Sequence, residues 1–499
     1  MNITKIATLG ELKASGYKSK TIKEELRDNL IAKLKNGKET FPGIIGYDET
    51  VIPDVERALL SKHNILFLGL RGQAKTRMAR LMTELMDEYI PAIAGSELND
   101  DPLNPVSKYA IEEIATHGDE TPIHWIHRSE RYGEKLATPD VSVADLIGDI
   151  DPIKAANLKL SFADERVIHY GIIPRSNRSI FVINELPDLQ ARIQVALFNI
   201  LEEGDIQIRG FKLRLKLDIL FVFTANPEDY TNRGSIVTPL KDRIESQILT
   251  HYPKDLDTAL AITEQEAWLD RPSPIEVRVP DYIRRVVEQL AFLAREDKRV
   301  DKRSGVSQRL PISVLENVVS NAERRALKCK DDAAVPRVTD IYSALPAITG
   351  KLELEYEGEL KGGDTVAREL IRTAVGKIYN EFFEGVNFSQ VINWFDIGGS
   401  LKLDEGVDSA TMVRQLDAIQ GLMEKTKALG LTENEPDAVR AAAAEFILEG
   451  LHAHRRISRN EERGFSAEDR PRPREPRERD REEGREGKGE RPNSRRGYN

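Results

Sequence analysis

The sequence is poor in the features that mark secreted and membrane proteins. Its single cysteine, Cys329, excludes an intramolecular disulfide framework and a cysteine-based metal site. No apolar run approaches the roughly 18 residues that a membrane-spanning helix requires. The first 20 residues also lack the apolar segment of a signal peptide. We therefore expect a cytoplasmic protein without membrane insertion.

Basic charge is not in excess either. The formal net charge of −10 disfavours a dedicated nucleic-acid binder, because such affinity comes mainly from Lys and Arg against phosphates. We expect no nucleic-acid partner, although a local basic channel is compatible with this total. The chain has 499 residues, which is too many for one hydrophobic core, so two to four domains are expected.

What is present is a strand–loop–helix pattern. The apolar run 65–68 is typical of a buried parallel strand. Met78, Leu81, Met82 and Leu85 then recur at helical spacing. The intervening loop reads G-x-x-x-x-A-K-T, which differs at one position from the phosphate-loop pattern G-x-x-x-x-G-K-[S/T]. Backbone N–H groups of such a loop, and the helix N-terminus behind it, bind phosphate.

This pattern predicts an ATP site in which Lys75 reaches the outer phosphates and the Thr76 hydroxyl binds Mg²⁺. The predicted nucleotide-binding residues are Gly69, Leu70, Arg71, Gly72, Gln73, Ala74, Lys75, Thr76 and Arg77. The alternative interpretation is a strand–turn–helix that happens to contain a lysine. It stays open because Ala74 places a Cβ where the pattern has glycine.

Two further apolar runs end in polar residues. The run 180–183 ends in Asn184 and Glu185, and the run 219–225 ends in Asn226. At such a strand end, the first residue holds Mg²⁺ through water and the second polarises the attacking water. We assign these roles to Asn184, which contributes no charge, and to Glu185. Asn226 is predicted to orient the water or to contact the γ-phosphate.

Two arginines are candidates for completing the site. Arg243, in the segment LKDRI, lies where a helix should end near a subunit face, and it is predicted to reach a neighbour's γ-phosphate. Arg233 is the alternative for this role. Arg309, at the start of a later helix, is predicted to reach back over the nucleotide.

Two other segments carry alternatives. His124 and His127 lie in a predicted strand that places them on opposite faces with no third ligand nearby, so no metal site is expected there. A hairpin over 206–217 has basic edges. These indicate a solvated edge or, alternatively, a surface that contacts a substrate.

The order of these motifs resembles that of AAA+ ATPases, and in particular the branch of the magnesium-chelatase ATPase subunit and the MoxR-type ATPases. The segments that carry the resemblance lie between Phe41 and Gly350, and they are FPGIIGYDETV, NDDPLNP, DLIGDIDPIKA, TANPEDY, LKDRI and GVSQR. The resemblance implies an α/β fold, with a P-loop (Walker A) parallel-sheet core and a helical lid. It implies Lys75 and Thr76 as phosphate and magnesium residues, and Glu185 as the catalytic acid. Asn226 and Arg309 would be the two sensors and Arg243 the arginine finger.

The predicted organisation has five parts: a helical lead-in (1–40), a nucleotide-binding core (41–272), a helical lid (273–350), an accessory helical domain (351–456) and a disordered charged tail (457–499). The last part is nearly devoid of apolar residues and cannot bury a core. The resemblance further implies a ring oligomer, commonly a hexamer, and a von Willebrand A-domain protein as partner.

Three functions follow from these features. The first is a chaperone-like hydrolase that uses ATP and Mg²⁺ to remodel or load a partner protein. The second is a nucleotide-gated scaffold with weak or no hydrolysis, suggested by Ala74 and Asn184. The third, a DNA-directed activator or helicase, requires a basic reading helix that the sequence does not show.

Overall fold

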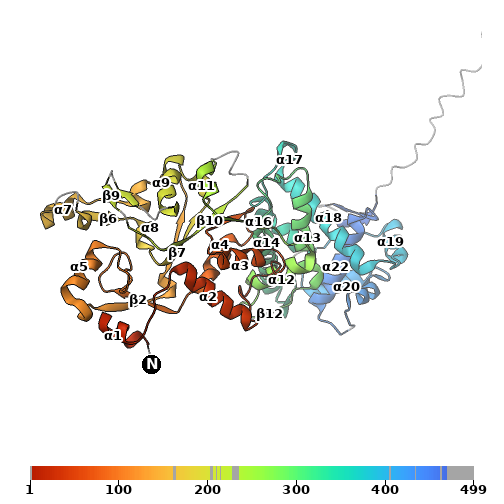
Figure 1. Ribbon diagram of the computed structural model, residues 1–499. Coiled ribbons are helices and arrows are strands. Elements are labelled where there is room, and N and C mark those ends of the chain that lie inside the picture. The colour runs from red at the N-terminus through yellow and green to blue at the C-terminus, as the bar shows by residue number, and fades with distance from the viewer. Residues whose placement is uncertain are drawn as a thin grey trace, which may run out of the picture.

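The computed structural model places a mixed α/β core at one end of an elongated molecule and a helical region at the other (Figure 1). It describes residues 3–160, 164–202, 206–208, 211–213, 215–227, 235–403, 406–432, 434–460 and 464–468. Arg233, the alternative finger, lies outside the described residues. So do Arg209, Arg214 and the tail beyond 468.

The core is built on a five-stranded sheet in the order β11-β1-β10-β7-β4, in which all four pairings are parallel. Its strands are β1 (Ile65–Leu68), β4 (Tyr132–Leu136), β7 (Ser179–Asn184), β10 (Ile219–Ala225) and β11 (Ser246–Leu249). Because the strands are parallel, their carboxyl ends meet at one edge, where ligands of open α/β sheets bind. The predicted α/β fold with a parallel sheet is confirmed.

Alternation along these strands produces a separate apolar layer on each face of the sheet. Ile65 and Phe67 of β1 pack into one cluster with α2 (Ile22–Lys35), α3 (Val51–Leu60) and α4 (Lys75–Leu81). Leu66 faces the opposite cluster, to which α9 (Ala191–Glu202) contributes. Helices on both faces explain why β1, β7 and β10 read as continuous apolar runs.

Short elements extend from the core. The helices are α1 (Leu9–Ala14), α5 (Lys108–His117), α6 (Val143–Leu146), α7 (Pro152–Leu158), α8 (Ile172–Arg175) and α11 (Thr238–Asp242). The antiparallel pairs are β2 (Tyr89–Ile93) with β3 (Ile123–His127), β5 (Gly148–Ile150) with β6 (Ile168–Tyr170), and β8 (Ile206–Ile208) with β9 (Phe211–Leu213). The predicted hairpin after α9 and the strand that contains His124 and His127 are confirmed.

Two regions contain elements that were not predicted above. The polar stretch 95–139 holds α5 and β4, in addition to the predicted β3, and β4 is an edge strand of the central sheet. The helix α9 begins at Ala191, after a 3₁₀ turn at Leu186–Asp188. The structure also corrects one expectation. The charged tail was expected from residue 457, but β14 (Ile457–Asn460) pairs with β15 (Gly464–Ala467), and Ile457 and Phe465 are buried.

The helical region starts next to the sheet and extends away from it (Figure 1). Its first part holds α12 (Leu256–Glu266), α13 (Asp281–Glu296), α14 (Arg309–Cys329), α15 (Val338–Ser343), α16 (Leu345–Thr349) and the pair β12 (Glu276–Val277) with β13 (Ala333–Ala334). Its second part holds α17 (Tyr356–Lys361), α18 (Gly363–Phe383), α19 (Ser389–Asp396), α20 (Ser409–Asp417), α21 (Leu422–Lys425) and α22 (Asp437–Ala453).

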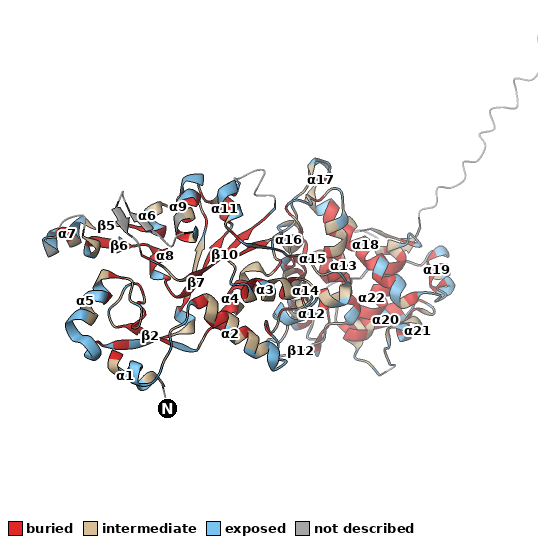
Figure 2. Ribbon diagram, viewed as in Figure 1, coloured by how far each residue is buried: buried red, intermediate tan, exposed pale blue. Residues whose placement is uncertain are grey.

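One hydrophobic core runs through both parts of this region. Residues from α13 and α14 belong to the same buried cluster as residues from α18 and α22. The Tyr282 ring of α13, for example, stacks on Phe446 of α22 with centroids 4.4 Å apart. Figure 2 shows this shared interior as buried ribbon along α13, α18 and α22, in contrast to the exposed α5 and α7. Residues 273–350 and 351–456 therefore pack as one body.

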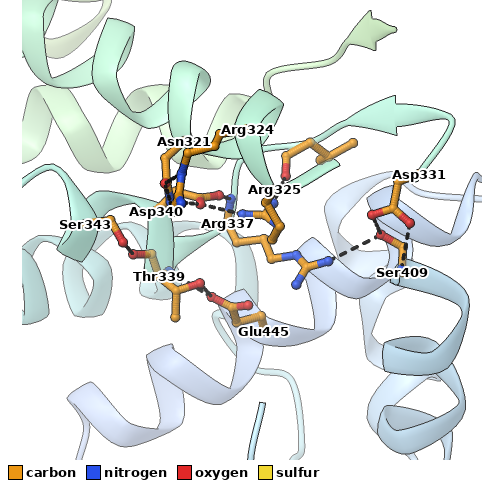
Figure 3. A network of polar contacts seen from close by, with 11 residues as sticks. Asn321, Arg324, Arg325, Asp331, Arg337, Thr339, Asp340, Ser343, Ser409 and Glu445 are labelled. Atoms are coloured by element: carbon orange, nitrogen blue, oxygen red, sulfur yellow. Dashed lines mark hydrogen bonds and ion pairs between the residues drawn. The ribbon is translucent and has the colours of Figure 1, made fainter. Parts of the chain in front are cut away.

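A buried polar network also joins the two parts (Figure 3). Asp340 of α15 pairs with Arg325 of α14. The Thr339 hydroxyl donates to Glu445 of α22 at 2.8 Å, and Arg337 donates to Ser409 of α20 at 3.3 Å. Because unpaired charges are costly to bury, these pairings fix one arrangement of the four helices.

Among the described residues, no helix combines the length and apolar character needed to cross a membrane.

Candidate functional site

A cavity of about 490 Å³ opens at the carboxyl edge of the sheet, between the core and the first lid helices. Its volume lies in the range of small-molecule sites. Residues from the phosphate loop, the ends of β7 and β10, and the lid line it together. The predicted site residues around it are Arg71, Gly72, Gln73, Ala74, Lys75, Thr76, Arg77, Asn184, Glu185, Asn226 and Arg309. Gly69 and Leu70 belong to the same loop, directly after β1.

The loop after β1 turns through two residues in left-handed backbone conformations. Gly72 and Ala74 both have positive φ, at 72° and 55°. Ala74 thus adopts the left-handed backbone that glycine adopts at low cost, and α4 begins at the next residue. The Lys75 ammonium donates to the carbonyl oxygens of Gly69 and Leu70, the latter at 2.9 Å. The loop and the first residue of α4 therefore form one compact unit at the cavity floor.

The ends of β7 and β10 bring the Asn184 and Thr224 side chains together next to Thr76. Asn184 Oδ1 accepts from the Thr76 hydroxyl at 3.3 Å and from the Thr224 hydroxyl at 3.1 Å. The same Thr224 oxygen accepts from the backbone N–H of Glu185 at 3.1 Å. Thr224 thus ties the two strand ends together. Sequence analysis did not single it out, because a threonine inside an apolar strand gives no signal of its own.

Glu185 is held in a strained backbone conformation. Its φ and ψ are 54° and 48°, in the left-handed region that a non-glycine residue seldom occupies. The strand ends here and a 3₁₀ turn follows, with Leu186 and Pro187 both buried. The glutamate side chain is exposed at the cavity. Such strain is typical of functional positions, where the surrounding structure enforces it.

A further carboxylate, which sequence analysis missed, lies beside Asn184. Glu134 Oε1 accepts from Asn184 Nδ2 at 2.6 Å. Its other oxygen, Oε2, accepts from Arg80 at 2.9 Å and from the Tyr132 hydroxyl at 3.1 Å. This carboxylate raises the pKa of the Arg80 guanidinium. Glu134 lies 50 residues before Asn184 in a polar stretch, so it becomes visible only through the pairing of β4 with β7.

The other end of the cavity is largely apolar. Ile44, Ile45, Tyr47, Ile262 and Ile312 line it, together with Pro253. The Tyr47 hydroxyl donates to the backbone carbonyls of Gln73 and His251, at 3.0 and 2.9 Å, and so fixes the upstream segment against the phosphate loop. Burial raises the pKa of this phenol.

The lid contacts the phosphate loop directly. A Cβ on Gly72 would lie 2.0 Å from the Ser307 hydroxyl oxygen, so glycine is required at this position by space as well as by its φ. Arg309 is the first residue of α14, as predicted, and its exposed side chain lines the cavity. Gln308 beside it is buried, and its amide donates to Glu288 Oε2 at 3.3 Å. The start of α14 is thereby anchored to the lid interior.

Arg243 does not line the cavity of its own chain. It caps the C-terminus of α11, as predicted, and donates through Nε to Glu202 Oε2 at 2.7 Å. Its guanidinium also lies 5.4 Å from the centre of the Phe198 ring. About 30% of its side chain is exposed. Arg243 is therefore a partly exposed residue outside the cavity.

The oxygens near Thr76 fit a magnesium ion that is bound chiefly through phosphates. Among the described residues, no group of three or more His, Cys, Asp or Glu side chains is arranged to hold a metal ion. Mg²⁺ commonly uses only one or two protein oxygens, together with waters and substrate phosphates. The Thr76 hydroxyl and the Asn184 amide oxygen supply such oxygens, and the Glu134 carboxylate lies behind them.

Comparison with solved structures yields matches at low identity. A proposed ATPase from Cytophaga hutchinsonii is 16% identical, covering 72% of this chain and 98% of its own, with a TM-score of 0.29. NtrX from Brucella abortus in complex with ADP is 13% identical, covering 79% of this chain and 72% of its own, with a TM-score of 0.37. A complex of the magnesium-chelatase subunits BchI and BchD is 18% identical, covering 64% of this chain and 98% of that one, with a TM-score of 0.33.

No family model matches the chain, and no curated protein matches its sequence.

Proposed function

We propose that the chain is an AAA+-type ATPase that binds ATP with Mg²⁺ and hydrolyses it as part of a ring oligomer. The observation that carries this proposal is the convergence around one cavity of the phosphate loop, the Asn184–Glu185 strand end, Asn226 and Arg309. These groups come from four separate chain segments. The alternative interpretation of the loop is a strand–turn–helix that happens to contain a lysine. That interpretation gives no reason for the other three segments to line the same cavity.

In this proposal, each residue has a separate task at the cavity. Lys75 exchanges its loop carbonyl partners for the outer phosphates, and the backbone N–H groups of the loop hold the phosphates in place. When bound, the magnesium ion neutralises developing charge on the transferred phosphoryl group. Glu185, exposed in the cavity next to the Asn184 side chain, accepts a proton from the attacking water. Asn226 orients that water.

Arg243 is assigned to a neighbouring subunit's site. It lies on the surface and outside the cavity of its own chain, where an arginine that acts in trans must be. To act, it has to leave Glu202, an exposed and therefore weak partner. This assignment requires a ring, with a hexamer expected from the sequence resemblance. A von Willebrand A-domain partner protein and its remodelling belong to the same proposal.

A nucleotide-gated scaffold with little or no hydrolysis is the second candidate. Asn184 favours it, because a neutral amide holds a metal-bound water less strongly than a carboxylate does. The two candidates share ATP binding and differ in turnover, so they are separated by the fate of bound ATP.

The direct test of nucleotide binding is Lys75→Ala, with Lys62→Ala as the matched control. Lys62 is an exposed lysine that pairs with Glu24 away from the cavity. We expect Lys75→Ala to weaken ATP binding about 100-fold or more in calorimetry, because charge-assisted hydrogen bonds to the phosphates are lost. Lys62→Ala should bind like the wild type. Equal affinity of the two variants would reject the proposed site.

A further inference from the structure

The amide of Asn184 lies between two hydroxyl groups and a carboxylate. Its Oδ1 accepts from Thr76 at 3.3 Å and from Thr224 at 3.1 Å, and its Nδ2 donates to Glu134 at 2.6 Å. Because an ionised carboxylate can only accept, the group that faces Glu134 must be the NH₂. Glu134 thereby fixes the amide with its oxygen toward Thr76.

The strand register explains how Glu134 reaches this place. In the parallel pairing of β4 with β7, Leu136 lies opposite Asn184 and Glu134 lies opposite Val182, two residues earlier. Glu134 extends diagonally across the pair toward the strand end. Its side chain is only 24% exposed, and two further donors, Arg80 and the Tyr132 hydroxyl, hold its outer oxygen. Its inner oxygen is left for Asn184.

We propose that Glu134 supplies the negative charge that Asn184 lacks in the magnesium site and orients the Asn184 amide oxygen toward the cation. This inference rests on the proposed function. Glu134 acts as a positioning residue, since it lies behind Asn184. In this arrangement, the carboxylate of the site lies on the neighbouring strand β4 and not at the end of β7. Asn184 connects this carboxylate to the cation.

The competing explanation is that Glu134 serves only as an ion-pair partner for Arg80. That pair is largely exposed on the arginine side, where 65% of the side chain is accessible. An exposed pair of this kind contributes little to stability. It also gives no reason for the second carboxylate oxygen to contact Asn184.

The proposal makes an unusual prediction for Asn184→Asp. This substitution restores the residue type expected at the end of such a strand, yet it would place two carboxylates at hydrogen-bond distance. Like charges at that distance cannot both ionise easily. Asn184→Asp alone should therefore weaken the metal site. Combining it with Glu134→Gln exchanges the amide and the carboxylate, so the pair again has one charge and one NH₂ donor.

The test measures how strongly Mg²⁺ promotes nucleotide binding in the full-length protein. The dissociation constant of ATPγS, a slowly hydrolysed analogue, is determined by calorimetry in excess Mg²⁺ and again in EDTA. The dissociation constant in EDTA divided by that in Mg²⁺ is called the magnesium ratio. It is compared for the wild type, Glu134→Gln, Asn184→Asp and the double variant. Glu84→Gln is the matched control, because Glu84 also pairs with an arginine, Arg128, at 2.7 Å, outside the cavity.

We expect each single variant to lower the magnesium ratio about 10-fold, the usual cost of losing an outer partner at a metal site. The double variant should recover most of that loss, and Glu84→Gln should match the wild type. Recovery also answers the concern that Glu134→Gln damages folding, since a misfolded site would not be repaired by a second substitution.

Three results would overturn the inference and keep the nucleotide site. The first is a wild-type ratio in Glu134→Gln, which would leave Glu134 as a partner of Arg80 only. The second is an additive loss in the double variant. The third is a wild-type protein that binds ATPγS equally with and without Mg²⁺. A wild-type protein that binds no ATPγS in either condition would reject the proposed function itself.

Discussion

Ala74 is the residue at which the phosphate loop departs from its usual pattern, and the structure shows how the departure is accommodated. The backbone keeps the left-handed conformation, with φ 55° and ψ 16°. An L-residue pays roughly 1–2 kcal/mol for this conformation. The methyl group is partly buried and packs against the cluster beneath α4. Alanine is therefore tolerated by the fold, and Ala74 alone does not argue against phosphate binding.

Substitutions at Ala74 test this conformation. Ala74→Gly should change the free energy of unfolding by no more than about 1 kcal/mol, because relief of the left-handed strain is offset by the greater freedom of glycine in the unfolded chain. Ala74→Val should lower it by about 2 kcal/mol, because a β-branched residue fits this region poorly. Urea denaturation of the three proteins measures both effects. Equal stability of all three would contradict the left-handed conformation.

Sequence reasoning located the site residues that lie at ends of apolar runs and missed those that depend on pairing between distant segments. Asn184 ends the buried strand β7, Asn226 directly follows β10, and Lys75 opens the helix after the loop that follows β1. A common edge for the three residues could therefore be predicted. Glu134 could not, because β4 is an edge strand whose sequence, YGEKL, has only a weak apolar face. The contact of Glu134 with Asn184 depends on the register between β4 and β7, which local sequence does not encode.

At the scale of elements, the lid is held together by a buried carboxylate. Glu288 of α13 accepts from the Thr263 hydroxyl of α12 and from the Gln308 amide just before α14. Gln308 in turn accepts from Arg295 Nη2 at 2.9 Å. Burial raises the pKa of Glu288 to about 7, and its hydrogen-bond donors and Arg295 oppose that rise. The helices α12 and α13 and the start of α14, which begins with Arg309, therefore meet at one titrating group.

This group predicts a pH-dependent effect of Glu288→Gln. Between the usual glutamate pKa, near 4.5, and about 7, the folded protein binds more protons at Glu288 than the unfolded chain does. Its contribution to stability is thus complete below pH 4.5 and is lost as pH rises toward 7. Glu288→Gln removes this loss, so the free energy of unfolding of the variant should exceed that of the wild type by less than about 1 kcal/mol at pH 5 and by about 3 kcal/mol at pH 8.

Chemical denaturation across this pH range measures the difference, with the exposed Glu296→Gln as control. A stability difference that does not change between pH 5 and pH 8 would show that Glu288 titrates normally in the folded lid.

The elements themselves were predicted well where apolar spacing was strong and poorly where burial comes from tertiary packing. The helix α2 of the predicted lead-in, the helix α4 and the start of α14 at Arg309 are found where the sequence predicts them. By contrast, β14 and β15 lie in a charged stretch. They are ordered because Ile457 and Phe465 join the core of the helical region and Arg459 pairs with the buried Glu449. The amino-acid composition of the segment does not predict these few contacts.

At the scale of the whole molecule, the lid and the C-terminal helices share one core and one buried polar network. The lid in turn contacts the phosphate loop at Gly72, and Arg71 pairs with Glu353 at 2.7 Å. We expect a change in the phosphate loop to move this whole helical body, because its interior gives no separate hinge between residues 350 and 351. The helical body would thus transmit the nucleotide state to a partner.

The site in one subunit contains every proposed group except the finger arginine, and Arg243 lies on the surface. The central claim is therefore that hydrolysis requires a second subunit. It is tested most directly by measuring ATP turnover per subunit against protein concentration, for the wild type, Glu185→Gln and Arg243→Ala. Binding of ATPγS is measured in parallel as the control for an intact cavity.

We predict that wild-type turnover per subunit rises with concentration to a plateau. Turnover should fall about 1,000-fold in Arg243→Ala, because an arginine finger usually raises kcat by at least about that factor. It should also be lost in Glu185→Gln, with both variants still binding ATPγS. Turnover that is independent of concentration and unchanged in Arg243→Ala would contradict a shared site. ATP binding without turnover at any concentration would identify the protein as a nucleotide-gated scaffold.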